Sequence, residues 1–244
     1  MHTVDRDARG TGDTPLASAQ YAVHAVHAAT PAGTPTHESD HLQASEQFQR
    51  LTRLFETGPA AILTGAGIST DSGIPDYRGT GSPPRTPMNI EQFTNDVRYR
   101  SRFWAGARIG ALRIANVRAN AGHEAVAALE QSGHLTGVIT QNVDSLHQRA
   151  GSENVIELHG SLFTTRCTRC SNHVLDDHAV HGEPPACPRC GSPMRPGVVW
   201  FGEMLPADLL LRAQALSQEC DVTLVVGTSA VVQPVTWQSS WPPR

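Results

Sequence analysis

The sequence predicts an α/β fold, a Rossmann-like parallel sheet into which a small zinc-binding module is inserted. Short apolar runs such as PAAILT and LTGVIT alternate with stretches that carry apolar residues at helical spacing. A glycine-rich loop follows the first apolar run, as in dinucleotide-binding units. Two Cys-x-x-Cys pairs interrupt the second half of the chain, and such pairs are typical of zinc sites.

The composition is that of an ordinary globular protein. The 244 residues are 39% hydrophobic and 17% charged, with a formal net charge of -4, which suits one domain with a small appendage. The acidic balance gives no basic footprint for nucleic acid. No apolar run is long enough to span a membrane, and the opening MHTVDRDARG lacks the pattern of a secretory signal. We therefore expect a cytoplasmic protein with reduced cysteines and with no membrane or nucleic-acid partner.

The first part of the chain is expected to be a flexible leader followed by alternating helices and strands. Residues 1–40 are rich in Ala, Thr, His, Pro and Gly and show no sustained periodicity. The elements expected after this leader are a helix over 41–57, a strand over 60–64, a helical stretch through Phe103 and Trp104, a helix over 121–133 and a strand over 135–140.

The second part is expected to complete the sheet around the cysteine insertion. The elements predicted there are a strand within VIELHG, a strand at 199–201, a helix over 205–219 and a strand over 222–229. Residues 41–160 and 196–235 are thus predicted to form the Rossmann-type domain, and residues 161–195 the zinc-binding module.

The stretch GAGISTDSGIPDYRG, residues 65–79, is the predicted ligand loop. Glycines after a strand let the backbone approach a pyrophosphate, and the following helix offers its amides. Thr70 stands where a dehydrogenase fingerprint has its third glycine, and no isolated strand with a ribose-binding acid follows. By itself the loop indicates a nucleotide only weakly.

The paired cysteines predict a structural zinc site. Sixteen residues separate the pair Cys167 and Cys170 from the pair Cys187 and Cys190, a spacing typical of four-thiolate sites. Four thiolates complete a tetrahedron and leave no position for a reactive water. The histidines between the pairs, His173, His178 and His181, are alternative ligands, although surface positions suit them better. The fifth cysteine, Cys220, is predicted to lie in the core.

Two polar groups follow predicted parallel strands, where open α/β sheets bind ligands. The first is the run Gln141 to Asp144 after LTGVIT, and the second is His159 after VIEL. A histidine near an amide and a carboxylate is a plausible base at neutral pH, although a histidine in such a place is more often a structural hydrogen bonder.

Taken together, these motifs resemble the successive signature blocks of the sirtuin family. The blocks are GAGISTDSGIPDYRG, TQNVDSLH, ELHG, the paired Cys-x-x-Cys, RPGVVWFGE and VVGTS, in family order from about residue 44 to residue 235. The resemblance implies an NAD-dependent protein lysine deacylase with one structural zinc. In that reaction an acyl-lysine oxygen attacks the ribose as nicotinamide leaves, and O-acyl-ADP-ribose is formed.

The resemblance also assigns roles to residues. It implies His159 as the general base and Asn142 as the second catalytic residue. It implies a groove in which the acyl-lysine peptide pairs with the backbone, formed by Val199, Phe201, Gly202 and Glu203. The residues that it implies for NAD are Gly65, Ala66, Gly67, Ile74, Pro75, Asp76, Tyr77, Arg78, Gln141, Asn142, Val143, Asp144, Gly227, Thr228 and Ser229.

Two departures from the family pattern carry expectations. Ala107 and Gly110 stand where class III sirtuins, which remove acidic acyl groups, carry Tyr and Arg, and the chain looks closer to class II. The chain also ends soon after VVGTSAVVQPV, in an aberrant tail over 236–244. Compared with the family it looks truncated, so we expect LVVGTS to be an exposed edge strand, the adenosine half of NAD to be held poorly and the chain to be weakly active and prone to aggregate.

Other functions compete with the deacylase. Protein mono-ADP-ribosyl transfer uses the same cofactor chemistry, and an inactive remnant would only bind acylated peptide. A zinc-ribbon nucleic-acid binder is disfavoured by the acidic balance. Release of nicotinamide from NAD separates the enzymes from the two binding modules, and the oligomeric state stays open.

Overall fold

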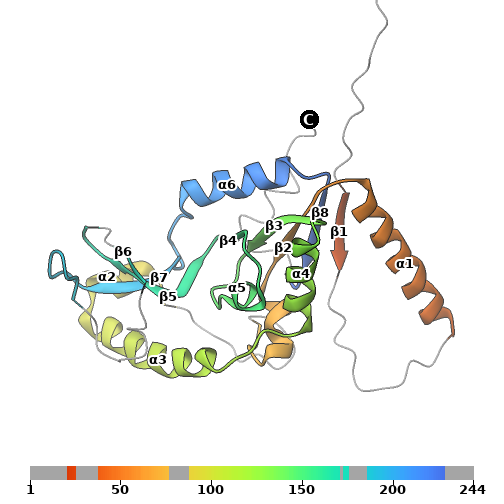
Figure 1. Cartoon of the computed structure of the whole chain (residues 1–244). Coiled ribbons are helices and arrows are strands. Elements are labelled where there is room, and N and C mark those ends of the chain that lie inside the picture. The colour runs from red at the N-terminus through yellow and green to blue at the C-terminus, as the bar shows by residue number, and fades with distance from the viewer. Residues whose placement is uncertain (1–20, 26–37, 77–87, 171–172, 176–185, 229–244) are drawn as a thin grey trace, which may run out of the picture.

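The structure, a computed structural model, contains a parallel sheet with helices on both faces and a smaller antiparallel sheet (Figure 1). It describes residues 21–25, 38–76, 88–170, 173–175 and 186–228. The predicted α/β, Rossmann-like class is confirmed. Among these residues, no helix is both long and apolar enough to cross a membrane.

The larger sheet has five strands in the order β1-β8-β2-β3-β4, and every neighbouring pair is parallel. The strands are β1 (Tyr21–Ala25), β2 (Ala60–Thr64), β3 (Leu135–Thr140), β4 (Val155–Glu157) and β8 (Val222–Val226). Because all the ladders are parallel, the carboxyl ends of the strands lie along one edge of the sheet. The loops that leave this edge carry most of the predicted site residues.

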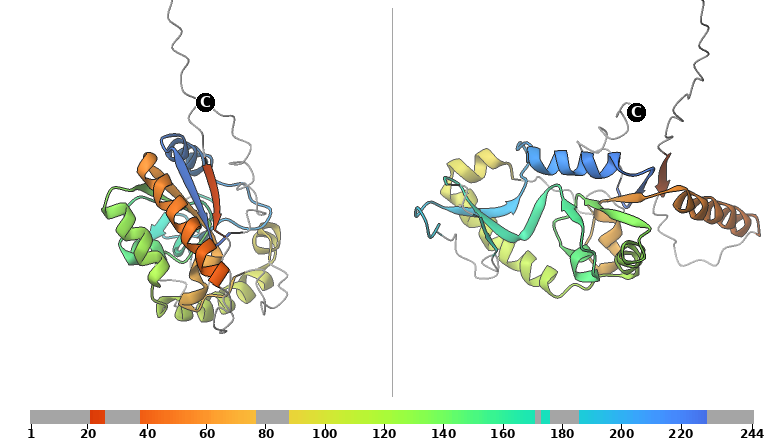
Figure 2. Two further views of the ribbon diagram at one scale, coloured as in Figure 1. Left: turned by 90° about the vertical axis from the view of Figure 1, so that its right-hand side faces the viewer. Right: turned by 45° about the horizontal axis from the view of Figure 1, so that its top comes forward.

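Helices cover both faces of the sheet, and the residues of β2 alternate between the two cores that result. Ala60 and Ile62 lie in the core cluster that includes helix α1 (Glu38–Thr57) and helix α4 (Ala121–Gln131). Ala61 and Leu63, the alternate residues, lie in the cluster that includes helix α6 (Ala207–Gln218). Successive side chains of a strand point to opposite faces, so a continuous apolar run suits a strand buried on both sides. Figure 2 shows α6 on one side of the sheet and α4 on the other.

The first strand of the sheet corrects two expectations. Residues 1–40 are predicted to be a flexible leader, yet β1 lies within them and pairs with β8 along five residues. As a result β8 lies between β1 and β2, and the prediction of an exposed edge at LVVGTS is wrong. A five-residue strand without strong flanking signals is stabilised by its distant partner, which local periodicity does not report. The predicted aberrant tail, 236–244, lies outside the described residues.

The smaller sheet has three antiparallel strands in the order β6-β5-β7. They are β5 (Gly160–Cys167), β6 (His173–Leu175) and β7 (Met194–Val198). Gly160 has a φ of 73°, and a Cβ atom there would collide with the carbonyl oxygen of Gly197. Only glycine therefore suits the start of β5, where this strand meets β7. Leu158, two residues earlier, still belongs to the core of the larger sheet.

The segment between β2 and β3 builds an aromatic cluster beside the smaller sheet. After the short 3-10 helix η1 (Ala66–Ser72) come α2 (Ile90–Asn95) and α3 (Val97–Ala115). Phe93 of α2 and Trp104 of α3 are fully buried against Trp200, with the Phe93 and Trp200 ring centroids 4.7 Å apart.

The cluster also holds the segment after β7 in place. The predicted strand at 199–201 is wrong, because β7 ends at Val198 and Phe201 forms only an isolated bridge with Asn89. A turn follows in which Gly202 has a φ of 86°. The remaining helix, α5 (Leu146–Ala150), lies between β3 and β4 in the chain.

Candidate functional site

The glycine-rich loop after β2 packs directly against the turn after β8. The amide of Gly65 donates to the carbonyl of Val226 over 3.1 Å, and the amide of Gly67 donates to the carbonyl of Gly227 over 2.7 Å. A Cβ atom on Gly67 would lie 2.8 Å from the backbone of Gly227, closer than real Cβ atoms approach. Glycine is therefore required here by the close approach of two loops. The structure thus brings together the first and the last of the predicted NAD-binding segments, with Ala66 at the start of η1.

Gln141 connects this pair of turns to the end of β3. Its Oε1 accepts a hydrogen bond from the hydroxyl of Thr228 over 2.9 Å, and its backbone amide donates to the carbonyl of Thr64 over 3.0 Å. Its Nε2 is buried and has no partner among the described residues. A buried amide donor without a partner costs free energy, so this atom is a natural contact for a bound polar ligand.

Asn142 and Asp144 are buried and point toward the glycine-rich loop. The Nδ2 atom of Asn142 donates to the carbonyl of Gly65 and to the hydroxyl of Ser69, each over 3.1 Å. Ser69 in turn donates to Oδ2 of Asp144 over 2.8 Å, and Oδ1 of Asp144 accepts from the amide of Leu146 over 3.0 Å. One serine hydroxyl thus joins the two predicted residues.

Ser69 and His123 are site residues that the sequence reasoning missed. Both are fully buried, and Nε2 of His123 lies 3.4 Å from the hydroxyl of Ser69. Nδ1 of His123 lies 3.3 Å from the backbone nitrogen of Asn120, the N-cap of α4, and 3.1 Å from Oδ1 of the same residue. A signal existed, because His123 shares one helix face with the buried residues Val126 and Ala127, and a buried histidine needs a polar partner.

His159 is oriented as a base. Its Nδ1 lies 2.9 Å from the carbonyl oxygen of Gln141. A carbonyl only accepts hydrogen bonds, so Nδ1 carries the hydrogen and Nε2 keeps the lone pair. Burial lowers the pKa of His159, and the bond to Gln141 partly opposes this shift. The imidazole is therefore neutral at pH 7 and able to accept a proton through Nε2.

The predicted substrate segment begins next to this histidine. The amide of Val199 donates to the backbone carbonyl of His159 over 2.8 Å. The carbonyl of Phe201 accepts from the amide of Ile90 over 3.2 Å, and the Phe201 residue remains 54% exposed. An exposed aromatic side chain therefore lies on the segment that is bonded to the candidate base.

Glu203 points into the protein and not into a groove. Its Oε2 accepts from Nη1 of Arg195 over 2.8 Å and from the amide of Trp200 over 3.0 Å. The side chains of Arg195 and Glu203 are only 11% and 22% exposed. The carboxylate therefore holds the turn through Gly202 in place, which is an indirect contribution to any groove.

The other predicted NAD residues divide between the described and the undescribed parts of the chain. The amide of Ile74 donates to the carbonyl of Ser69 over 3.2 Å, which starts the segment through Pro75 and Asp76. The carbonyl of Val143 accepts from the amide of Leu162 over 3.0 Å. Tyr77, Arg78 and Ser229 lie outside the described residues, as do His178 and His181.

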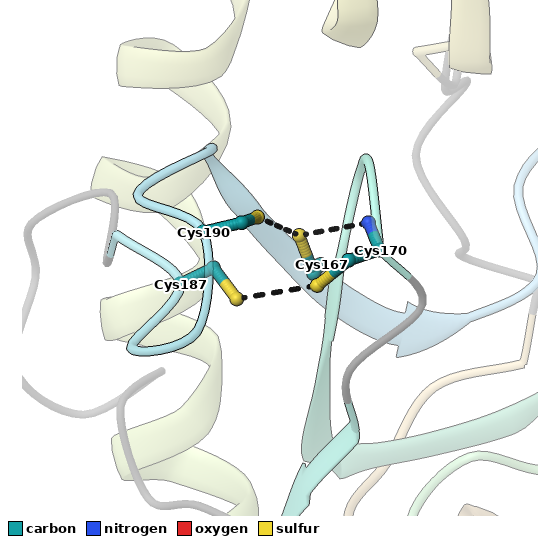
Figure 3. Close-up of side chains that lie close together, drawn as sticks. All are labelled: Cys167, Cys170, Cys187 and Cys190. Atoms are coloured by element: carbon teal, nitrogen blue, oxygen red, sulfur yellow. Dashed lines mark hydrogen bonds between the residues drawn. The ribbon is translucent and has the colours of Figure 1, made fainter.

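The four paired cysteines meet at the end of the smaller sheet (Figure 3). Cys167 and Cys170 come from the end of β5, and Cys187 and Cys190 from the turn before β7. All four Sγ atoms lie within 4.8 Å of one another, and the Cys167–Cys190 and Cys170–Cys187 distances are 3.4 and 3.6 Å. A zinc ion with bonds of about 2.3 Å places tetrahedral sulfurs roughly 3.8 Å apart, so the cluster fits one zinc.

Hydrogen bonds prepare these thiols to bind a cation. The side chain and backbone of Ser192 bond to Cys190 and are the main cause that lowers its pKa to about 6. Burial raises the pKa of Cys187, but hydrogen bonds from the backbone of Arg189 and Cys190 bring it below its usual value. Thiolates are the form that binds metal. The donor set is complete with four sulfurs, so a zinc ion here is structural.

The chain is similar to known proteins over most of its length. Residues 65–234 match the model of the Sir2 family. The chain is 46% identical over 190 residues to the NAD-dependent protein deacylase 1 of Archaeoglobus fulgidus, a match that covers 75% of this chain and 76% of the relative.

Solved structures of Sir2 proteins are also similar to this chain. A crystal structure of a Sir2 homolog–NAD complex has a TM-score of 0.70 and 44% identity, and covers 77% of this chain and 75% of the other. A Sir2–p53 peptide–NAD+ structure has a TM-score of 0.69 and 38% identity, over 77% of this chain and 78% of the other.

Proposed function

The chain belongs to the Sir2 family, and from that membership we propose that it is an NAD-dependent protein lysine deacylase. The reaction consumes NAD and an acyl-lysine protein, and it releases nicotinamide and O-acyl-ADP-ribose. The relatives that carry deacylase names, and the neighbours solved with NAD and with a p53 peptide, support this proposal.

The observation that carries the proposal is the orientation of His159. Its Nδ1 is held by the carbonyl of Gln141, which leaves Nε2 as the free basic nitrogen at the same sheet edge as Asn142 and Asp144. A neutral imidazole is suited to accept a proton from a ribose hydroxyl. Asn142, held by Gly65 and Ser69, would order the ribose region as the second catalytic residue.

The site also fits NAD as a co-substrate. Gly67 and Gly227 meet backbone against backbone, and the buried Nε2 of Gln141 lacks a partner among the described residues. NAD would supply the ribose carbon from which nicotinamide departs. Residues 74–78, Val143, Asp144, Thr228 and Ser229 would complete the contacts, with Tyr77 excluding water.

The acyl-lysine peptide would bind along the segment after β7. Val199 is bonded to the backbone of His159, and the exposed Phe201, two residues later, offers an apolar surface. Gly202 allows the turn that ends this segment, and Glu203 anchors it through Arg195.

The zinc-binding module would span 161–195, between the two parts of the Rossmann-type domain at 41–160 and 196–235. Location in the cytoplasm stays a prediction.

The decisive experiment measures nicotinamide release from NAD with an acetyl-lysine peptide and with the unacetylated peptide. We expect release only with the acetylated peptide, together with formation of the O-acetyl product. His159→Ala and Asn142→Ala should each lower the rate by a factor on the order of a hundred, whereas NAD binding should change much less.

Matched controls separate the alternatives. His134→Ala, a change at an exposed histidine, should leave the rate unchanged. Label transferred from NAD onto protein without deacylation would favour mono-ADP-ribosyl transfer. Peptide binding without any release of nicotinamide would contradict the enzyme and favour a binding module.

A further inference from the structure

Ser145 has an unusual backbone conformation in the loop that carries Asn142 and Asp144. Its φ is 54° and its ψ 27°, and it is the only residue other than glycine with a positive φ in the described part of the chain. Such a conformation is unfavourable for a residue with a Cβ atom, and it persists where the surroundings enforce it. The contacts of Ser145 therefore show what holds this loop.

A directed series of hydrogen bonds holds Ser145. Its hydroxyl donates to Oε1 of Glu157 over 2.9 Å, so the Ser161 hydroxyl, 3.1 Å away, donates to Ser145. The Ser161 oxygen also accepts from the amide of Phe163 over 3.1 Å. Glu157 lies at the end of β4, where burial raises its pKa and hydrogen bonds from Ser145 and Gln148 oppose that shift. We call Ser145, Glu157 and Ser161 the loop latch.

Two residues of the loop latch flank the candidate base His159 in the sequence. Glu157 lies two residues before His159 and Ser161 two residues after it. The amide of Leu162 adds a backbone bond to the carbonyl of Val143 over 3.0 Å. The Ser145–Glu157, Ser145–Ser161 and Leu162–Val143 contacts join the loop with Asn142 and Asp144 to the segment with His159. These contacts add to the direct bond between His159 and Gln141, so the relative position of the two segments is set in part by residues outside the candidate site.

We propose that Glu157 and Ser145 are positioning residues for the reaction, which hold Asn142 and Asp144 at the required distance from His159 without touching substrate. This inference rests on the proposed deacylase function. A small displacement of reacting groups has a large effect on rate, on the order of a hundredfold for about 1 Å. Loss of the latch should therefore lower kcat more than it weakens NAD binding.

The variants are chosen to isolate the hydrogen bond. Glu157→Ala removes the acceptor and should lower kcat roughly ten- to a hundredfold, with a change in the NAD dissociation constant of less than about threefold. Glu157→Gln keeps an oxygen at Oε1 and should restore kcat to within about threefold of the parent. Ser145→Ala should resemble Glu157→Ala, and the double variant should be no slower than either single variant.

Glu130→Ala is the matched control. Glu130 is also a glutamate that accepts two hydrogen bonds, from the amides of Glu153 and Asn154. Those bonds lie just before β4 begins, at the opposite end of that strand from Glu157, and they involve neither Ser145 nor Ser161. This variant should lower the melting temperature without changing kcat at temperatures where it stays folded.

A second measurement needs no turnover. Amide hydrogen exchange over residues 142–146 of the NAD-free protein should become faster in Glu157→Ala and stay unchanged in Glu130→Ala. If the parent protein releases no nicotinamide, the proposed function fails while this exchange result still decides the latch. Unchanged amide exchange or an unchanged kcat in Glu157→Ala would refute the latch. So would a Glu157→Gln variant whose kcat stays as low as that of Glu157→Ala, or a double variant in which the two losses of kcat multiply.

Discussion

At the residue scale, His147 connects the buried polar network to Asn142. The imidazole is almost fully buried, and its Nε2 lies 2.9 Å from the hydroxyl of Thr64. Thr64 donates to Thr140 over 2.8 Å, and Thr140 accepts the amide of Asn142 over 3.1 Å. Because Thr64 uses its hydrogen on Thr140, Nε2 of His147 must be the donor. A neutral imidazole is thus connected through Thr64 and Thr140 to the loop that carries Asn142.

This arrangement makes the stability of the protein depend on pH. Burial, with a smaller effect of His123, lowers the pKa of His147 to about 3 from the ordinary 6.5. Between these values the unfolded chain binds a proton at His147 that the native state does not, so the free energy of unfolding falls as the pH falls below about 6.5. We expect the melting temperature to drop between pH 7.5 and pH 5.

The variant His147→Gln, which keeps a donor near Nε2, should flatten this pH dependence even if it lowers stability overall. His134→Gln, at an exposed site, should leave the slope unchanged. Thermal melts across the pH range compare the three proteins. A slope in His147→Gln equal to that of the parent would contradict the assignment.

At the scale of elements, the smaller sheet depends on the cysteine cluster. Among the described residues, its apolar cluster contains only Cys167, Cys187 and Met194 as buried members, with Cys170 packed against them. A core of this size supplies little burial energy, and small modules of this kind are usually held by a metal. The ends of β5 and β7 are therefore expected to need the ion.

We predict one zinc per chain, and its loss when one ligand is removed. Metal analysis should find about one equivalent of zinc in the parent protein and much less in Cys170→Ala, together with greater protease sensitivity over 161–195. The control is Cys220→Ala, because Cys220 is buried beside Thr136 in the larger sheet and lies outside the cluster. Folded parent protein free of zinc would overturn the site.

Helix α3 is the element that sets the expected acyl preference. Ala107 packs against the aromatic cluster of Trp104 and Trp200, next to the segment of Phe201. Gly110, one turn later, has open space around its Cβ position. Neither residue offers a positive charge to an acidic acyl group, and a buried carboxylate without such a partner is costly.

Acetyl removal is therefore expected to exceed succinyl removal by roughly tenfold or more. Gly110→Arg should raise the succinyl rate, since the open space accepts a side chain. Gly106→Arg, on the same helix and equally open, should not. Paired assays of kcat/KM on acetyl and succinyl peptides decide this, and faster succinyl removal by the parent chain would refute it.

At the scale of the whole molecule, the N-terminal strand completes the sheet. β1 pairs with β8 from Tyr21 opposite Val222 to Ala25 opposite Val226. Without it, β8 would expose a row of backbone groups beside the turn at Gly227, and unpaired edges invite association with other chains. The same strand that protects the edge therefore also supports one of the candidate NAD turns.

Two deletions test this pairing. Removal of residues 1–25 should lower the melting temperature by roughly 5 °C or more, increase aggregation and weaken NAD binding. Removal of residues 1–20 leaves β1 in place and should have little effect. Equal melting temperatures and equal solubility for the two shortened proteins would show that the pairing contributes nothing.

The sequence by itself determined the features that depend on neighbouring residues. The strands at 60–64 and 135–140 and the helix at 121–131 lie where the apolar spacing places them, within two residues. The four cysteines cluster as predicted: each Cys-x-x-Cys pair is formed within one turn, and the pairing of β5 with β7 brings the two pairs together. The sequence also predicts where Gln141 and His159 lie, because each follows a strand and the carboxyl ends of parallel strands share one edge of the sheet.

Only the tertiary structure decided which distant residues meet. Ser69 bonds to Asp144 across 75 residues of sequence, and β8 gains β1 as a partner. A local pattern records which side chains are apolar or polar and at what period, but not which remote group satisfies a buried donor or an open strand edge. That choice is made when the whole chain packs, because buried polar groups and unpaired strands are costly until their partners arrive.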